Sequence, residues 1–489
     1  MKRQPAEINY FFKQGYIEFF AVIIGIFKGC GYTIAKSWRG VCEHFVDFIG
    51  CVSEIFDEFF PALGNLFMLI FHLCIVLLSI FLAIPVSILI AAVQAVLLLV
   101  LMVLFYAAFL IVLFADWVYR RIKRISTSCP NCQEKFALPT YQCVCGAEHT
   151  KLVPSRYGIF SRVCSGNGSS CRRKLKTTFF NGRQKLPGEW ICPHCNYVLG
   201  SPLQSDLPIP VVGGPSSGKT CYISMVISQL EKKASSDYNL SFEYKENAAL
   251  GDDYADNREQ MSRGRLPLKT NDMRLRYYQF YLAKNGAKVR NLVSLCDVAG
   301  ETYEHSEEMG RQIGFKYADA FLMLVDPLSV MAYREEVAQK VDISKYGASE
   351  KSMDEVLDGL IHTLESMKCI DSKSSIKTDV AVVFTKCDIP GLDDKIGAAA
   401  VNRYRTQNSG VSKYDAQNKV CEQFLTEYEE ENFLNTLRSK FKSIQFFTCS
   451  ALGHVENGKQ FAPTNVEEPT LWLIDKVNSS LSLKKKFSE

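Results

Sequence analysis

The sequence predicts an α/β fold, with a six-stranded mixed sheet and flanking helices over residues 205–482. A small Cys-rich unit and an α-helical membrane hairpin precede it. Three observations carry this prediction. Short apolar strands alternate with helical patterns after residue 205. Eight cysteines, mostly in close pairs, fall between Cys129 and Cys195. No Asp, Glu, Lys or Arg occurs from Leu66 to Phe114.

The overall composition is ordinary. The chain has 489 residues, of which 47% are hydrophobic and 22% charged, and its net charge is +4. A charge this small argues against a dedicated nucleic-acid binder, so no nucleic-acid partner is expected. The N-terminus lacks an apolar core followed by a small-residue cleavage site, so no secretory signal is expected.

The uncharged run Leu66–Phe114 is the membrane signal. One span needs ~20 apolar residues, so the run has room for two. Pro85 lies near its middle, where a helix is expected to break. We therefore expect helices over 66–84 and 88–115, within a hairpin of residues 63–119. Two full crossings and a re-entrant hairpin are both open, whereas a buried hairpin in a soluble core needs no run of this length.

The residues after this run indicate its orientation. An aromatic belt and a basic cluster follow it: Trp117, Tyr119, Arg120, Arg121, Lys123 and Arg124. This order is typical of the cytoplasmic end of a span. We expect a multi-pass or hairpin-inserted protein of the cell inner membrane, with its N-terminus, Cys-rich region and α/β domain in the cytoplasm.

Residues 1–62 mix apolar and acidic side chains. We expect amphipathic helices there that lie on the membrane or pack on the hairpin. Tyr16–Phe27 is apolar apart from Glu18, but 12 residues are too few for a third span.

The paired cysteines of residues 125–200 have the spacing of zinc ligands, because short turns let two thiolates grip one ion. Four consecutive pairs argue against free buried thiols, and four thiolates leave no open position for catalysis. We predict two structural zinc sites, with His149 and His194 as weaker candidate ligands. The first site is expected to hold Cys129, Cys132, Cys143 and Cys145, and the second Cys164, Cys171, Cys192 and Cys195.

A phosphate-binding loop lies between the apolar strand Leu207–Val212 and the helical stretch Cys221–Leu230. It reads G-x-x-x-x-G-K-T: Gly213, Gly214, Pro215, Ser216, Ser217, Gly218, Lys219 and Thr220. Backbone amides and the helix N-terminus would bind phosphate oxygens, Lys219 would reach the β- and γ-phosphates, and Thr220 would ligate Mg²⁺. We count Cys221 among the nucleotide contacts. The loop alone does not distinguish ATP from GTP.

Two strands are expected next, over 273–282 and 289–296, joined by an Asn-Gly turn. The second strand runs into Asp297-Val-Ala-Gly300-Glu301, and this arrangement resembles that of Ras-like GTPases. The resemblance implies that Asp297 holds Mg²⁺ through water and that the Gly300 amide contacts the γ-phosphate. Thr270, ahead of the hairpin, would be the switch threonine that ligates Mg²⁺.

The segment Thr385-Lys386-Cys387-Asp388 follows an apolar strand and resembles the guanine-recognition motif [N/T]KxD. Asp388 would accept hydrogen bonds from guanine N1–H and its amino group, which adenine does not offer, so ATP is rejected. The Lys386 stem would lie along the base. A later segment, Ser450-Ala451-Leu452, resembles the SAK-type loop, whose Ala451 amide would contact guanine O6.

These motifs, in this order, resemble the TRAFAC class of P-loop GTPases over about residues 205–480, with an insert at 328–378. The insert is charged and helical in pattern, which makes it a candidate partner surface. Together with the membrane hairpin and the Cys pairs, the layout resembles the bacterial double-GTPase type 2 (DO-GTPase) group. That resemblance implies a role in multi-component GTPase systems of conflict or defence.

For catalysis the resemblance assigns Lys219, Thr270, Gly300 and Glu301. Glu301 stands where many Ras-like proteins have a water-positioning Gln. Three arginines are candidate arginine fingers: Arg263, Arg265 and Arg311.

Two functions remain. The first is a membrane-anchored GTPase switch that converts GTP to GDP and phosphate. The second is a GTP-binding scaffold with negligible turnover. Asp388 disfavours an ATPase motor. The expected cofactors are GTP/GDP, Mg²⁺ and two Zn²⁺, and the expected partners are the lipid membrane, proteins of a GTPase system and further copies of the chain.

Overall fold

The computed structural model describes most of the chain, in two compact units. The described residues are 4–53, 59–129, 132, 134–166, 171–199, 204–244, 251–267, 276–287, 289–297, 315, 317–366, 376–454, 460–483 and 486–487. The first unit comprises Met1–Tyr119 and Thr140–Glu189, and the second comprises Arg120–Pro139 and Trp190–Glu489. The Cys-rich region, predicted as one unit, is therefore divided between the two.

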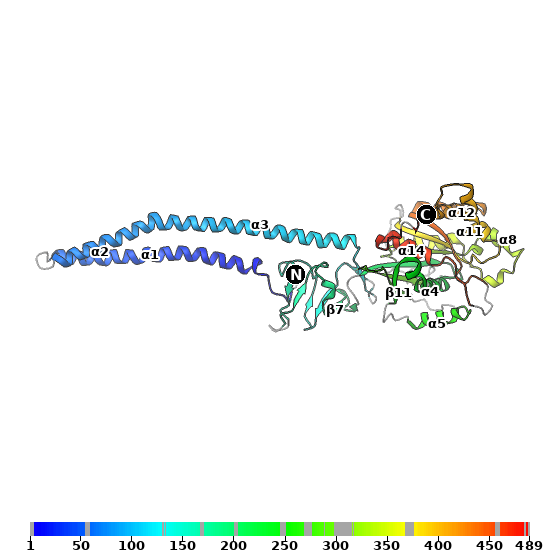
Figure 1. The fold of residues 1–489 in the computed structure, drawn as a ribbon, viewed down its shortest axis with the longest axis horizontal. Coiled ribbons are helices and arrows are strands. Elements are labelled where there is room, and N and C mark those ends of the chain that lie inside the picture. The colour runs from blue at the N-terminus through cyan, green and yellow to red at the C-terminus, as the bar shows by residue number, and fades with distance from the viewer. Residues whose placement is uncertain are drawn as a thin grey trace. The chain divides into compact units, whose positions relative to one another are not determined.

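The first unit contains a long helical hairpin (Figure 1). Its helical elements are η1 Tyr10–Phe12, α1 Gln14–Ser53, α2 Phe59–Leu78, the π-helical η2 Ser79–Ala83, and α3 Ile84–Ile122. α1 runs antiparallel to the other arm. The His44 and His72 rings stack with centroids 5.4 Å apart, and Cys30 Sγ lies 3.1 Å from Ser87 Oγ.

The predicted turn at Pro85 is wrong, because the helix runs through that residue. Pro85 has no N–H to donate, and the π-helical turn before it absorbs the missing hydrogen bond: the Ile84 N–H donates to Ser79 O instead. Local π adjustments of this kind make proline tolerable in membrane helices. The two arms of the hairpin are therefore α1 and α2–α3.

The amphipathic segments expected in residues 1–62 are mainly one helix, α1. By length and composition, two helical stretches are candidate membrane spans, Gln14–Val52 and Phe60–Ile122. The exclusion of Tyr16–Phe27 as too short is therefore corrected, since those 12 residues belong to a helix of 40 residues. The prediction measured only the apolar stretch between charged residues. It therefore missed a long helix whose charged residues all lie on one face.

Short antiparallel strands carry the cysteines. The first unit has β3 Thr140–Cys143 paired with β4 Glu148–His149, and β5 Ser161–Val163 paired with β6 Lys174–Lys176, followed by η3 Arg183–Lys185. The second unit has β1 Thr127–Ser128 paired with β2 Lys135–Phe136, and the end of β7 Gly188–Ile191 paired with β8 Val198–Leu199.

A seven-stranded sheet forms the α/β domain, in the order β10-β11-β12-β9-β13-β14-β15. Its strands are β9 Gln204–Gly213, β10 Leu240–Tyr244, β11 Arg276–Lys284, β12 Arg290–Asp297, β13 Ala320–Val325, β14 Ile376–Phe384 and β15 Phe441–Thr448. β12, β9, β13, β14 and β15 are parallel, whereas β10 and β11 are antiparallel to their neighbours.

The sheet thus has one strand more, among the described residues, than the six expected from the sequence. The extra strand is β10, which joins the edge by pairing Leu240 with Lys284. Its alternation of Leu240, Phe242 and Tyr244 with polar residues was the available signal.

Helices cover both faces of the sheet. They are α4 Lys219–Tyr238, α5 Gly251–Ser262, η5 Pro327–Ser329, α8 Met331–Ala338, η6 Ile343–Tyr346, α9 Met353–Ser366, α10 Asp393–Ile396, α11 Ala398–Gln407, α12 Lys413–Glu427, α13 Glu431–Lys440, α14 Glu467–Val477 and η7 Ser479–Leu481. In β13 Phe321 and Met323 enter one core and Leu322 and Leu324 the other, so the strand is buried on both faces, as parallel strands usually are.

Candidate functional site

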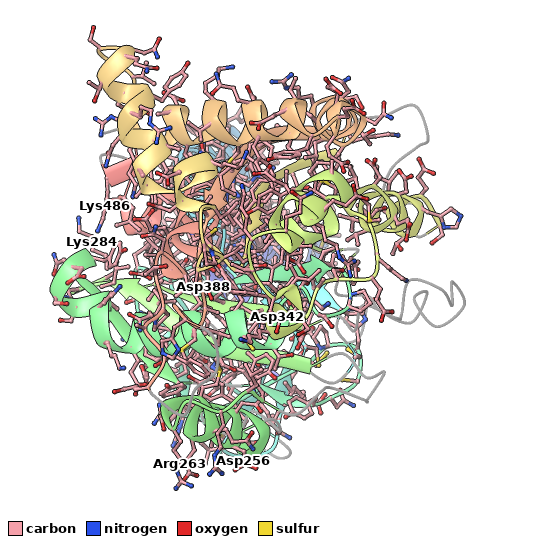
Figure 2. All side chains as sticks on the ribbon, turned by 90° about the vertical axis from the view of Figure 1, so that its right-hand side faces the viewer. Asp256, Arg263, Lys284, Asp342, Asp388 and Lys486 are labelled. Atoms are coloured by element: carbon pink, nitrogen blue, oxygen red, sulfur yellow. The ribbon has the colours of Figure 1, made fainter. Side chains whose placement is uncertain are left out.

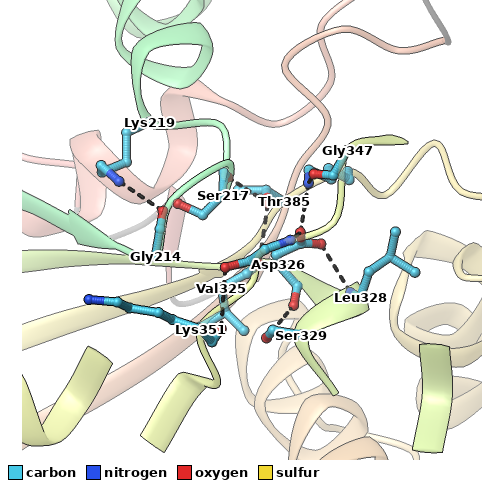
Figure 3. Close-up of polar contacts among 12 residues, drawn as sticks. Gly214, Ser217, Lys219, Val325, Asp326, Leu328, Ser329, Gly347, Lys351 and Thr385 are labelled. Carbon is cyan, nitrogen blue, oxygen red and sulfur yellow. Dashed lines mark hydrogen bonds and ion pairs between the residues drawn. The ribbon is translucent and has the colours of Figure 1, made fainter. Parts of the chain in front are cut away.

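The phosphate-binding loop lies where β9 meets α4. Lys219 Nζ donates to Gly213 O at 2.8 Å and to Gly214 O at 2.9 Å, so the loop curls around the ammonium group (Figure 3). A Cβ on Gly213 would lie 2.6 Å from Ser217 Oγ, and Gly218 has φ +88°, so both positions require glycine. The helix N-terminus at Lys219 completes a concave set of N–H groups suited to phosphate.

Two residues predicted to serve Mg²⁺ meet beside this loop. Asp297 ends β12 and Thr220 lies in the first turn of α4. Thr220 Oγ1 donates to Asp297 Oδ2 at 3.1 Å. A hydroxyl and a carboxylate are hard oxygen ligands, so this donor set fits Mg²⁺.

The base-reading segment is joined to the phosphate-binding loop by a buried hydrogen bond. Thr385 follows β14, and its Oγ1 donates to Ser217 O at 3.0 Å (Figure 3). The Thr385 N–H donates to Val325 O at 2.9 Å, which holds the segment to the end of β13. The two halves expected to bind a nucleotide are therefore adjacent.

Asp388 lies next to the loop after β15. Ser450 Oγ donates to Asp388 Oδ1 at 2.6 Å, and the Gly453 N–H donates to Ser450 Oγ at 2.7 Å. The structure thus brings together the two segments predicted to read guanine, which are 62 positions apart in the sequence. Burial raises the pKa of Cys387 well above its usual value, so this neighbouring thiol stays protonated.

Asp326 is a site residue for which the sequence analysis predicted no role. Its side chain is fully buried and accepts from Lys386 Nζ at 2.6 Å, from the Ser349 N–H at 2.8 Å and from the Leu328 N–H at 3.0 Å (Figure 3). Lys386 also donates to Gly347 O at 2.7 Å. The available signal was an acidic residue at the carboxyl end of a buried strand, where ligands of α/β sheets gather.

The insert at 328–378 contributes to this site. A Cβ on Gly214 would lie 2.5 Å from Ser349 Oγ, so the insert packs directly on the phosphate-binding loop. Burial and then the Asp388 charge raise the pKa of Tyr346, a residue of the insert. The described part of the insert up to residue 366 is mainly helical, in agreement with its sequence pattern, whereas its last three residues, 376–378, already belong to β14.

Several predicted catalytic residues cannot be placed. Thr270, Gly300, Glu301 and Arg311 lie outside the described residues. Arg263 pairs with Glu259 on α5, and Figure 2 shows it at the margin of the molecule. The Arg265 N–H donates to Gln260 O at 2.9 Å in the same exposed turn.

The remaining predicted residues lie at or beside the loops described above: Pro215, Ser216 and Cys221 around the phosphate-binding loop, and Ala451 and Leu452 after β15.

Eight cysteines form two clusters of four, with all Sγ atoms of a cluster within 4.8 Å of one another. In the second unit Cys129 lies 3.5 Å from Cys195, and Cys132 lies 3.6 Å from Cys192. In the first unit the distances are 3.9 Å for Cys143–Cys171 and 3.7 Å for Cys145–Cys164. Tetrahedral zinc with Zn–S bonds of about 2.3 Å requires about 3.8 Å between sulfurs, so both clusters have the geometry to hold it.

The predicted grouping of these cysteines is wrong. Cys129 and Cys132 join Cys192 and Cys195, not the neighbouring pair, and the middle four residues form the other cluster. The fold brings the pairs together in this way, because β1–β2 and the end of β7 with β8 belong to the second unit.

Neither candidate histidine belongs to a four-cysteine cluster. His149 Nε2 lies 3.2 Å from Cys164 Sγ, and burial followed by the Arg162 charge lowers its pKa to about 4. The neutral imidazole is therefore a hydrogen-bond partner of a candidate ligand sulfur, and such partners orient metal ligands.

Each cluster is fastened to its own unit. In the second unit Lys135 Nζ lies 2.8 Å from Asp319 Oδ2, and Tyr317 OH donates to Glu134 Oε2 at 2.7 Å. These contacts join the cluster that contains Cys129 to the start of β13. In the first unit Asp116, near the end of α3, accepts from the Phe179 N–H at 3.1 Å and lies 3.7 Å from Arg183. The segment that follows the cluster containing Cys143 is thereby joined to the hairpin.

Comparison with known proteins identifies a protein family that the chain matches. A family model described as Double-GTPase 2 matches residues 207–460. No curated protein matches the chain. Among solved structures, the Saccharomyces cerevisiae Ski7 GTPase-like domain bound to GTP is 13% identical, with 56% of this chain and 50% of that chain covered and a TM-score of 0.29. Methanosarcina barkeri Roco2 RocCORdC bound to GDP is 11% identical, with coverages of 58% and 50% and a TM-score of 0.22. The match spans half the length of those structures.

Proposed function

The chain belongs to the double-GTPase 2 family, as the resemblance of its motifs implied, and from this premise we propose that it is a membrane-anchored GTPase. It binds GTP with Mg²⁺, hydrolyses it to GDP and phosphate, and acts as a switch in a multi-component system of conflict or defence. The observation that carries the proposal is the Thr385–Ser217 hydrogen bond, which joins the base-reading segment to the phosphate-binding loop.

The phosphates bind in the loop Gly213–Thr220. Lys219 already lies at the loop's centre, where its charge offsets that of the β- and γ-phosphates. Thr220 and Asp297 would hold Mg²⁺, which would supply further charge neutralisation when bound.

The base binds between Lys386 and the loop after β15. Asp388 accepts from the two donors on the guanine edge, and Ser450 holds that carboxylate in place. Asp326 positions Lys386 through their buried ion pair, so that the lysine stem presents a flat apolar surface to the ring.

Hydrolysis is assigned to the switch residues Thr270, Gly300 and Glu301, with Lys219 as the fixed cation. Thr270 and Gly300 engage only when the γ-phosphate is present. Single-turnover hydrolysis of GTP by the purified chain tests this assignment. A chain that binds GTP but releases no phosphate is instead the nucleotide-controlled scaffold.

The hairpin anchors the protein in the cell inner membrane, with both ends of the chain in the cytoplasm. Its seam supports this, because small and polar groups meet there: Ser37 and Ser79 are buried, and Gly40 leaves room for His72. The outer face of α2–α3 exposes Phe, Leu, Ile and Val. In the α2–α3 arm, a polar seam beneath an apolar outer face is the pattern of membrane helices, not of a water-soluble coiled coil.

Both Cys₄ clusters bind structural Zn²⁺. Small units with so little core need a metal to fold, and four thiolates close the coordination sphere. The basic cluster at Arg120–Arg124 directs the downstream chain to the cytoplasm. Protease accessibility in sealed inside-out vesicles tests the topology, since the proposal requires the α/β domain on their outer surface.

A further inference from the structure

All six charged side chains of α1 lie on one face of the helix. They are Glu18, Lys28, Lys36, Arg39, Glu43 and Asp47. At 3.6 residues per turn they fall within an arc of roughly 100° that runs the length of the helix. We call this arc the charged stripe. It carries three acidic and three basic groups, so its net charge is zero.

The charged stripe faces away from the other arm of the hairpin. The seam of α1 runs through Cys30, Ser37 and His44, which are on the opposite side of the helix. The five charged residues of the stripe from Lys28 to Asp47 are exposed. Within the described part of the chain, no side-chain hydrogen bond or ion pair is present for any of these five residues.

The charged stripe lies beside the most apolar part of the molecule. Cys30 contacts Ser87 and His44 contacts His72, so Lys36, Arg39 and Glu43 run alongside residues 72–87. That stretch lies wholly inside the uncharged run, and its own outer face is apolar. The same depth of the hairpin therefore carries charges on one side and Leu, Ile and Phe on the other.

A single copy that spans the membrane has no placement that satisfies both sides. In lipid, each exposed charge costs about 2.5–3.5 kcal/mol near the centre of a span. In water, α2–α3 would expose a large continuous apolar face, and such faces normally contact a membrane or another protein. A partner that covers the charged stripe shields it from lipid and leaves α2–α3 facing lipid.

We propose that the charged stripe is a self-association surface: α1 of one copy packs against α1 of a second copy, with α2–α3 outward to lipid. The inference rests on the proposed membrane anchoring. Two copies inserted with the same topology lie parallel about a two-fold axis, which sets each residue against the adjacent turn of its partner. Arg39 of each copy then faces Glu43 of the other, and the pair is made twice.

The remaining stripe residues suit close approach. Gly25 and Gly29 have open space where a Cβ would be, and their four-residue spacing leaves a shallow groove at the N-terminal half of the stripe. Small residues at this spacing let membrane helices pack with their backbones close together. The basic residues of the stripe end at Arg39 and its acidic residues resume at Glu43, so a parallel second copy brings opposite charges together at this boundary.

Photocrosslinking of the full chain in its membrane tests the surface. Tyr32 lies on the charged stripe and is 70% exposed, and Leu89 lies on the outer face of α3 and is 63% exposed. Each is replaced in turn by photoreactive benzoylphenylalanine. We expect position 32 to give a product of two copies of this chain and position 89 to give lipid adducts only. A product at position 32 with lipid, or with another protein, overturns the proposal.

Charge exchange gives a second, independent test. Arg39→Glu and Glu43→Arg should each weaken association in vesicles at least about tenfold, measured by energy transfer between labelled copies. The double variant should restore it, because the pairs re-form with their signs exchanged. Failure of the double variant to restore association, with membrane insertion intact, overturns the proposal.

Alkaline extraction of the same membranes separates the two hypotheses. A chain released by alkali sinks the anchoring itself. A chain that stays in the membrane but does not crosslink to a second copy sinks only the self-association.

Discussion

Replacing Thr385 by Val removes one hydroxyl and leaves the side-chain volume nearly unchanged. Thr385 is buried, and its hydroxyl donates to Ser217 O at 3.0 Å. The hydroxyl is therefore expected to act on the phosphate-binding loop and not on the nucleotide itself. The substitution therefore tests whether the junction between base-reading segment and phosphate-binding loop matters for nucleotide binding.

The magnitude follows from the acceptor that is left behind. A buried carbonyl that loses its donor costs about 1–3 kcal/mol, and 1.4 kcal/mol is a factor of ten. If the loop must be held in its binding shape, Thr385→Val should lower the affinity for GTP and for GDP alike by about 5- to 140-fold. Both nucleotides should be affected equally, because the hydroxyl lies between base and phosphate sites and not near the γ-phosphate.

Titration of the purified chain with fluorescent GTP and GDP analogues measures the loss, and Thr385→Ser, which keeps the hydroxyl, is the matched control. We expect the Ser variant to stay within a few fold of the wild type. Unchanged affinity in the Val variant, or an equal loss in the Ser variant, would refute the reasoning, because the hydrogen bond would then not hold the loop.

Further predictions concern the same site and the cysteine clusters. Asp388→Asn should lose GTP affinity and gain affinity for xanthosine triphosphate, since its amide offers a donor where xanthine has a carbonyl; competition binding decides, and a retained GTP preference excludes this base-reading role. Lys219→Ala and Thr220→Ala should each weaken Mg²⁺-nucleotide binding at least about tenfold in the same titration, and full affinity in either variant would locate the phosphates elsewhere. Metal analysis should find about two zinc ions per chain and about one in the double variant Cys129→Ser/Cys192→Ser, because these residues share one cluster; a double variant that loses both ions contradicts the pairing.

The nucleotide site could be predicted from the sequence because each motif consists of neighbouring residues in one short segment. Gly213–Thr220 must follow a strand and begin a helix, and Asp297 and Asp388 must end or follow strands of one sheet. Parallel strands deliver their carboxyl ends to one edge, so motifs in this order converge whatever lies between them. The Asp388–Ser450 contact is an example, since nothing but the sheet relates its two segments.

The order of elements and the chemistry of each motif were thus determined by the sequence alone, because they depend on neighbouring residues, on strand ends and on local periodicity. Tertiary structure alone decided which cysteines meet, since eight equivalent thiolates carry no information on grouping until the segments that carry them pack together. It also decided that the helix passes through Pro85, because a π-helical turn and the packing of α1 outweigh the local preference for a break. It gave Asp326 its role, because a buried carboxylate is defined by the three donors that reach it from Lys386, Ser349 and Leu328, and these come together only when the sheet has formed.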